Sequence, residues 1–232
     1  MSWAKSKASI IILYVLGLSL LFGLSIWQYK RGLAKQTIEA IRQNSSSAGI
    51  TSAGGNWDGL LYRDSTLRGR WLVGRSFLLE NRIFQGRVGF EVLTPYQLQD
   101  DNKVLLVNRG LVETSGGLTS PEVAQDTIIQ GVPYIPEKGL ELGEAILPES
   151  ASSKRWPKKS LYIDLSVFAR VLGTDLEPVV FVLNGSDPSA YERIWKASVM
   201  SSSKHFGYAV QWLGLALTFL VYGVIWFKRR EK

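Results

Sequence analysis

The sequence predicts a two-span α-helical membrane anchor, with helices near the N- and C-termini, plus a mainly antiparallel β extracytoplasmic domain with one or two helices. Three observations predict this fold class. Residues 9–27 and 206–227 contain no charged side chain. Between them, short runs rich in Val, Leu and Phe are separated by Gly, Asn, Asp and Pro. The two short tails carry most of the excess positive charge.

Each uncharged stretch is long enough to cross a bilayer. At about 1.5 Å rise per residue, roughly 20 apolar residues span a hydrocarbon core of about 30 Å. We therefore expect membrane-spanning helices over residues 9–29 and 206–227. A cleaved signal peptide is the alternative for the first, but its apolar run is longer than such peptides need and lacks a small-residue cleavage site. A buried core helix is the alternative for the second, but three cations follow it directly.

The distribution of charge predicts the orientation in the membrane. The formal net charge is +7, of which residues 1–8 contribute +2 and residues 228–232 contribute +3. Under the positive-inside rule both tails are cytoplasmic, which leaves residues 30–205 outside. Cations just after the first span oppose this orientation, but a long domain translocates largely regardless of its charge. The basic balance thus indicates membrane topology and not nucleic-acid binding.

The cysteine and histidine content excludes several kinds of site. The chain has no cysteine and one histidine, His205. Disulfides, thiolate metal sites and covalent haem attachment through cysteines are therefore excluded, and so are histidine-dependent hydrolase triads. A Ser/Lys dyad at Ser203 and Lys204 is the remaining hydrolase hypothesis, but adjacent residues do not direct their side chains at each other. We do not expect an enzyme.

The region between the spans has the pattern of a small β domain. Residues 36–42 can continue the first helix, and residues 43–56 form a Gly/Ser-rich linker. After it, six apolar runs predict the strands of an antiparallel barrel or sandwich, with a hairpin turn at 99–102. These runs are residues 66–72, 76–81, 88–93, 104–112, 127–132 and 179–183.

Two further segments interrupt this pattern. Residues 164–172 place Leu165, Phe168 and Leu172 on one face of a helix, and Gly173 suits its C-cap. The stretch 133–160 is rich in Pro, Glu and Lys and is expected to be an exposed loop.

Three motifs are more informative than composition. They are WQYKR at residues 27–31, GRVGFEVLTP at 86–95 with VNRG at 107–110, and HFGYAVQW at 205–212. For Gly86, Gly89, Pro95, Asn108, Arg109 and Gly110 a structural role in strands and turns is favoured. In a helix, His205, Tyr208 and Trp212 share one stripe. Trp27 could pack against this stripe and complete an aromatic slot with one imidazole at its top.

Together these motifs resemble the surfeit-locus assembly-factor family, which assists biogenesis of cytochrome c oxidase. The resemblance covers nearly the whole chain, through the order and spacing of the motifs. Two departures concern Leu111, where the family usually has an aromatic residue, and the serines 201–203, where it often has a proline. The resemblance implies a non-catalytic factor. Because no mitochondrial transit segment fits before Ser9, we expect a bacterial inner membrane, with the central domain periplasmic.

The resemblance also implies a cofactor site. Bacterial members of the family are associated with haem a, and the histidine implicated as the iron ligand corresponds to His205. The expected cofactor-binding residues are His205, Tyr208, Trp212, Trp27 and Gln28. Arg193, Lys196 and Lys204 are near enough in sequence to meet the haem propionates, although interfacial snorkelling is the favoured explanation.

Two functions follow as hypotheses. In the first, the protein holds haem a transiently at the outer membrane face and passes it to the catalytic subunit of cytochrome c oxidase. Haem-a synthesis and assembly proteins would be further partners. In the alternative, the protein is a scaffold that stabilises an oxidase assembly intermediate without touching haem, since Trp and Tyr collect at membrane interfaces whatever the function.

Overall fold

A computed structural model describes residues 2–43, 57–84, 87–100, 102–113, 126–136, 143–191 and 201–230. The chain forms two compact units, a helix pair (residues 1–40 and 198–232) and a β domain (residues 41–197). The predicted linker lies outside the described residues from position 44 onward.

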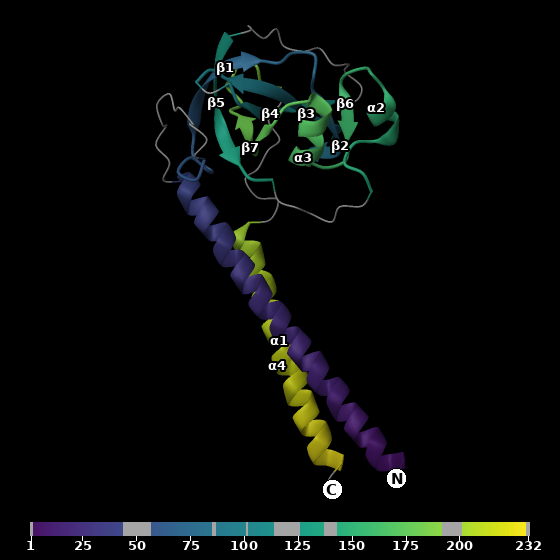
Figure 1. Cartoon of the computed structure of the whole chain (residues 1–232). Helices are drawn as coiled ribbons and strands as arrows, with labels where there is room; N and C mark the ends of the chain where they lie inside the picture. Colours follow the sequence, from purple (N-terminus) through teal and green to yellow (C-terminus); the bar gives the residue numbers. More distant parts are fainter. Residues whose placement is uncertain are drawn as a thin grey trace. The chain divides into compact units, whose positions relative to one another are not determined.

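The helix pair consists of α1 (Ser2–Gln43) and α4 (Ser202–Arg230), which run side by side with both termini at one end (Figure 1). Both helices are long and apolar enough to cross a membrane. They exceed the predicted spans: α1 continues to Gln43, as predicted for residues 36–42, and α4 begins at Ser202. The stretch after Lys30 continues α1 because it consists mostly of strong helix formers.

The β domain contains one seven-stranded sheet, in the order β1-β5-β7-β4-β3-β2-β6. Because β1 also pairs with β3, five of these strands close into a ring. The β4–β7 and β2–β6 pairs are parallel and the others antiparallel. The prediction of a mainly antiparallel β domain is therefore confirmed, with a barrel as its architecture. The strands are β1 (Ser65–Trp71), β2 (Phe77–Phe84), β3 (Arg87–Leu98), β4 (Val104–Glu113), β5 (Asp126–Tyr134), β6 (Lys158–Ser160) and β7 (Leu176–Leu183).

Closure of the ring depends on the long strand β3 and on a glycine in β1. The first part of β3 pairs with β2, and its last part pairs with β1. Gly69 pairs with Leu98 on one side and with Thr127 on the other. A Cβ atom at Gly69 would lie 2.1 Å from the carbonyl oxygen of Gln97. Only glycine fits where the three strands converge this closely.

Strand β4 supplies side chains to two hydrophobic cores. Leu105 and Val107 face the barrel interior, whereas Leu106 belongs to a second core beneath α3 (Leu165–Leu172). In this second core, the rings of Phe77 and Phe168 stack with centroids 4.1 Å apart. Because successive residues of a strand face opposite sides, a strand covered on both faces is apolar throughout. This explains why residues 104–107 are all apolar.

Helix α3 confirms the predicted amphipathic segment. Asp164 caps its N-terminus, with Oδ1 accepting hydrogen bonds from the backbone N–H groups of Ser166 and Val167. Gly173 ends the helix at a φ of 71°, which a glycine adopts without strain. Phe168 and Leu172 are buried against the sheet.

The expectation of an exposed loop over residues 133–160 is wrong for much of its described part. Pro133 lies inside β5, and α2 (Pro148–Ser152) and β6 follow. Ile146 is buried in the core beneath α3, and β6 pairs with β2. The Pro, Glu and Lys content concealed this, because β6 is only three residues long and carries lysine at two of them.

The VNRG motif does not form a turn but lies within β4, where the pairing with β7 ends and the pairing with β3 shifts register. The Asn108 side chain accepts from the backbone N–H of Gly110 at 2.9 Å and donates to Glu91 at 3.2 Å. Arg109 Nε donates to the carbonyl of Ser189, and its guanidinium lies over the Trp71 ring. These contacts support the structural role favoured from the sequence; Gly86 lies outside the described residues.

We predict that Gly69→Ala destabilises the β domain by about 1–3 kcal/mol, because the added methyl group overpacks against a backbone carbonyl that cannot move freely. Thermal unfolding of the full chain in detergent should show a melting temperature lowered by several degrees. Gly59→Ala is the matched control, since a Cβ there meets nothing within 4 Å. Equal melting temperatures for the two variants would contradict the assigned barrel closure.

We predict that Glu91→Gln becomes more favourable, relative to the natural chain, as the pH rises. Burial raises the pKa of the Glu91 carboxyl, against weaker opposite effects of Arg82 and of the Asn108 hydrogen bond. The contribution of this carboxyl to stability therefore falls as the pH rises from its unfolded pKa through its folded pKa. Melting temperatures measured from pH 4 to pH 8 check this. The melting temperature of the variant minus that of the natural chain should rise with pH, and a constant or falling value counts against the prediction.

Candidate functional site

The two long helices meet along a seam of small and polar side chains. On α4, the buried residues His205, Ala209, Ala216 and Gly223 recur at spacings of four and seven. This is the heptad repeat of antiparallel helices that cross at a shallow angle. Small residues on such a seam let two apolar helices approach closely, and polar side chains can then bond across it.

The single histidine lies on this seam opposite Gln28. His205 Nδ1 is 2.7 Å from Gln28 Oε1, and the imidazole is only 8% exposed. With the amide oxygen as acceptor, Nδ1 carries the proton and Nε2 keeps its lone pair. Among the residues that the structure describes, Nε2 has no hydrogen-bond partner. When the ring is neutral, this pairing leaves Nε2 as the nitrogen with a lone pair.

One turn further along α1, a glycine makes room for the ring of Phe206, the neighbour of His205 in sequence. A Cβ atom at Gly32 would lie 2.6 Å from the ring of Phe206. Phe206 also meets Tyr29, with ring centroids 5.8 Å apart. The aromatic ring next to His205 in sequence is therefore held against α1, which restricts rotation of the first turn of α4.

The N-terminus of α4 is capped by a carboxylate of the other helix. Glu39 accepts hydrogen bonds from the backbone N–H of Ser202, at 3.0 Å, and from its hydroxyl, at 2.5 Å. An anion at this place satisfies an unpaired helical N–H and interacts favourably with the helix dipole. Lys35, four residues before Glu39, is buried on the same side of α1. The cap fixes the register of α4 three residues before His205.

A second polar bond crosses the seam on the other side of the histidine. The Ser25 hydroxyl donates to the backbone carbonyl of Ala209 at 2.9 Å. Gln28 and His205 thus lie between two cross-helix contacts, one through Ser25 and one through Glu39. This arrangement fixes the position of the imidazole from both directions along the helix axis.

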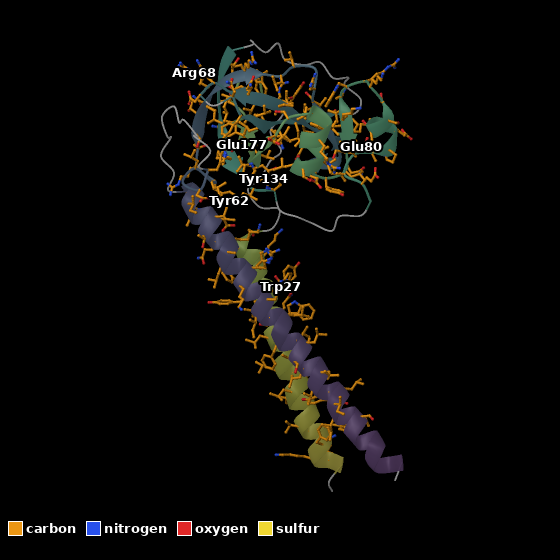
Figure 2. The ribbon with its side chains drawn as sticks, viewed as in Figure 1. Trp27, Tyr62, Arg68, Glu80, Tyr134 and Glu177 are labelled. Atoms are coloured by element: carbon orange, nitrogen blue, oxygen red, sulfur yellow. The ribbon has the colours of Figure 1, made fainter. Side chains whose placement is uncertain are left out.

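The remaining predicted site residues lie outside the seam. Trp27 is 52% exposed and projects from the helix pair (Figure 2), and Tyr208 is 44% exposed. Neither ring contacts another aromatic ring in the described part of the chain. Trp212 is partly buried. The structure therefore brings Gln28 to the imidazole, and the aromatic slot around His205 stays a prediction.

The cations and serines near His205 are placed as follows. Lys204 is exposed, whereas Arg193 and Lys196 lie outside the described residues. The hydroxyls of Ser201 and Ser203 are 3.0 Å apart, and neither contacts Lys204 within the described chain. This arrangement gives no support to a Ser/Lys dyad.

Sequence reasoning named Gln28 and His205 but did not pair them, and it missed Ser25, Gly32 and Glu39. A signal for the missed residues exists in the spacing. Ser25, Gln28, Gly32 and Glu39 interrupt or follow the apolar stretch at intervals of three, four and seven. Small and polar residues at such intervals indicate the face that a membrane helix turns toward a partner.

Comparison with known proteins agrees with the motifs. Residues 15–217 match the SURF1 family, a range that contains both Gln28 and His205. A SURF1-like protein of Rickettsia conorii is 26% identical over 220 residues, which cover 91% of this chain and 88% of that protein. A SURF1-like protein of Rickettsia felis is 25% identical over 229 residues, covering 95% and 96%. The chain therefore belongs to the SURF1 family, whose members are assembly factors of cytochrome c oxidase.

Proposed function

We propose that this assembly factor holds haem a transiently through His205 and passes it to the catalytic subunit of cytochrome c oxidase. The observation that supports this most directly is the bond between His205 Nδ1 and Gln28 Oε1. Histidines that bind metals almost always donate their other ring N–H to an acceptor, which fixes the tautomer and the ring orientation. The helix pair already provides this arrangement.

The residues around His205 fit a haem in three respects. Haem, when bound, supplies an iron that takes an axial imidazole. Nε2 of His205 is the nitrogen available for that bond. The exposed rings of Trp27 and Tyr208 offer apolar surface to a macrocycle, and Lys204 offers a cation to a propionate.

Transient holding is consistent with the donor set. The chain contains one histidine and no cysteine, and the described residues contain no cluster of three or more His, Asp or Glu able to hold a metal. With His205 as the one imidazole ligand, the iron would remain able to accept a ligand from the receiving protein. A carrier needs this property, whereas a permanent haem protein gains stability from a second ligand.

The proposal includes a membrane orientation. We infer that the protein lies in a bacterial inner membrane with both termini cytoplasmic and the β domain periplasmic, because the tails carry the excess positive charge. The end of the helix pair that holds His205 would then lie at the periplasmic face. The haem-a synthesis proteins and the catalytic subunit are the partners that this placement suits.

A scaffold without haem is the second candidate, and the exposure of Trp27 and Tyr208 favours it. Large aromatic side chains exposed beside a fixed polar seam also suit contact with another membrane protein. In that case the His205–Gln28 bond would serve helix packing alone.

We predict that the natural chain, co-expressed with haem-a synthesis enzymes, purifies with haem a and that His205→Ala loses it. Pyridine haemochrome analysis measures the haem per chain, and circular dichroism confirms that both proteins are folded. Haem a in equal amounts on both would exclude His205 as the ligand. If neither folded protein carries haem, the scaffold function takes precedence, and Trp27→Ala should then weaken capture of oxidase subunits.

We predict that Gln28→Leu lowers haem affinity by about 10- to 100-fold, the usual cost of removing the partner of a metal-bound histidine. Gln28→Glu should restore it, because a carboxylate also accepts the proton of Nδ1. Gln36→Leu is the matched control, since Gln36 is exposed on the same helix. A merely structural role of Gln28 predicts equal losses for Leu and Glu and an unchanged haem spectrum in whatever fraction binds.

A further inference from the structure

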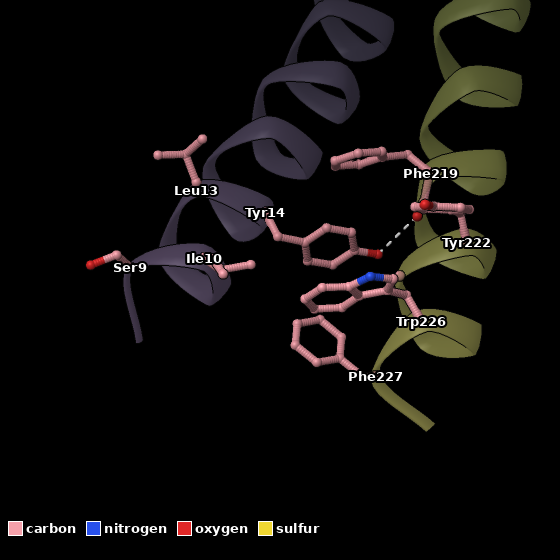
Figure 3. Close-up of a pocket in the computed structure, with 9 residues that line it drawn as sticks. Ser9, Ile10, Leu13, Tyr14, Phe219, Tyr222, Trp226 and Phe227 are labelled. Atoms are coloured by element: carbon pink, nitrogen blue, oxygen red, sulfur yellow. Dashed lines mark hydrogen bonds between the residues drawn. The ribbon is translucent and has the colours of Figure 1, made fainter. Parts of the chain in front are cut away.

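The end of the helix pair that carries both chain termini contains an apolar groove of about 370 Å³ between α1 and α4 (Figure 3). It lies at the end of the seam opposite His205 and shares Gly223 with it. Its wall is largely aromatic. The lining residues are Ser9, Ile10, Leu13, Tyr14, Phe219, Tyr222, Gly223, Trp226 and Phe227.

Tyr14 holds the helices in the position that leaves this groove open. Its hydroxyl donates to the carbonyls of Phe219 and Leu220, at 3.0 and 3.1 Å. The ring occupies the space that a side chain at position 223 would need, since a Cβ at Gly223 would lie 2.3 Å from the Tyr14 hydroxyl oxygen. The ring therefore acts as a spacer whose polar atom is already satisfied.

The groove surface is almost entirely apolar. Tyr14 packs on Phe219 with centroids 4.7 Å apart and meets Phe227 edge to face at 6.0 Å. Trp226 meets Phe227 edge to face at 4.9 Å. These contacts fix the rings as a wall, while Leu13 and Tyr222 remain largely exposed at the groove mouth. Such a surface suits a hydrocarbon chain.

Cations lie where such a chain would end. Lys228 and Arg229 follow Phe227 directly and are exposed. A volume near the lower limit for ligand pockets, about 300 Å³, admits part of one acyl chain and no bulky ring system. Basic sites between helices at a membrane face bind anionic lipid headgroups.

We propose that this groove binds one anionic glycerophospholipid, with an acyl chain between α1 and α4 and the phosphate at Lys228 and Arg229. Charge complementarity selects this occupant, because the groove is apolar and its only described charged neighbours at the end of α4 are cations. A lipid bound there would bridge the two helices at the end opposite His205. The site is independent of haem.

Native mass spectrometry of the full chain in non-ionic detergent tests this. Dioleoyl phosphatidylglycerol and dioleoyl phosphatidylethanolamine are added at equal concentration. We expect one phosphatidylglycerol per chain, preferred by about five-fold for each contributing cation. Equal retention of the two lipids, or retention of neither, overturns the proposal, because it indicates ordinary solvation of an apolar helix pair or contact with detergent.

Variants separate the two parts of the site. The double variant Lys228→Gln/Arg229→Gln should abolish the preference for phosphatidylglycerol. Lys30→Gln/Arg31→Gln removes two exposed cations away from the groove and should leave the preference intact. Ile10→Trp should fill the groove and reduce retention of both lipids, with circular dichroism to confirm folding. Equal loss of preference in the two double variants would show a general charge effect and overturn the site.

Discussion

Close approach of α1 and α4 is the constraint on which the helix pair depends. Lipid tails are as apolar as leucine, so the helices gain little by burying large aliphatic side chains against each other. They gain from close packing and from polar bonds that lipid cannot replace. Small residues permit that approach, namely Gly32, Ala209, Ala216 and Gly223. The approach in turn allows hydrogen bonds between the helices, which Ser25, Gln28 and Glu39 of α1 form with residues of α4. The position of His205 is a consequence of this packing.

The same seam gives the two ends of the pair different chemistry. At one end, polar side chains of α1 meet the first turn of α4 and leave one imidazole nitrogen available. At the other end, Tyr14 replaces them as the bridging group and keeps an apolar groove open. Both arrangements follow from one rule: a polar group inside an apolar pair must be satisfied by its neighbour. A ligand for each end can therefore be inferred, from the imidazole nitrogen that has no hydrogen bond within the described chain at one end and from the unfilled apolar groove at the other.

A different constraint governs the β domain, in which five strands must close into a ring that leaves no strand edge unpaired. Long strand β3 pairs with β2 and then with β1, and Gly69 allows the crossing. Strand β4 is buried on both faces because the barrel interior lies on one side and α3 on the other. Arg109, held between the Trp71 and Tyr191 rings at 5.2 and 4.8 Å, links β4 to the segment that follows β7.

Elements with strong local signals could be predicted from the sequence. The apolar stretches near each end, the strand over 104–112 and the capped helix at 164–172 were all identified, because each reflects a periodicity or a cap within a few residues. Strand β6 was not identified. Its three residues, two of them lysines, form a strand only because β2 offers an edge to pair with.

The sequence by itself determined the two membrane helices, the β character of the domain between them and the identity of His205 as the one imidazole. Hydrophobicity and residue type are local properties that can be read without knowing the fold. The tertiary structure alone decided that Gln28 meets His205, that Glu39 caps α4 and that β1 closes the barrel on β3. Those contacts join residues far apart in the chain, and which side chains meet depends on the packing of whole elements.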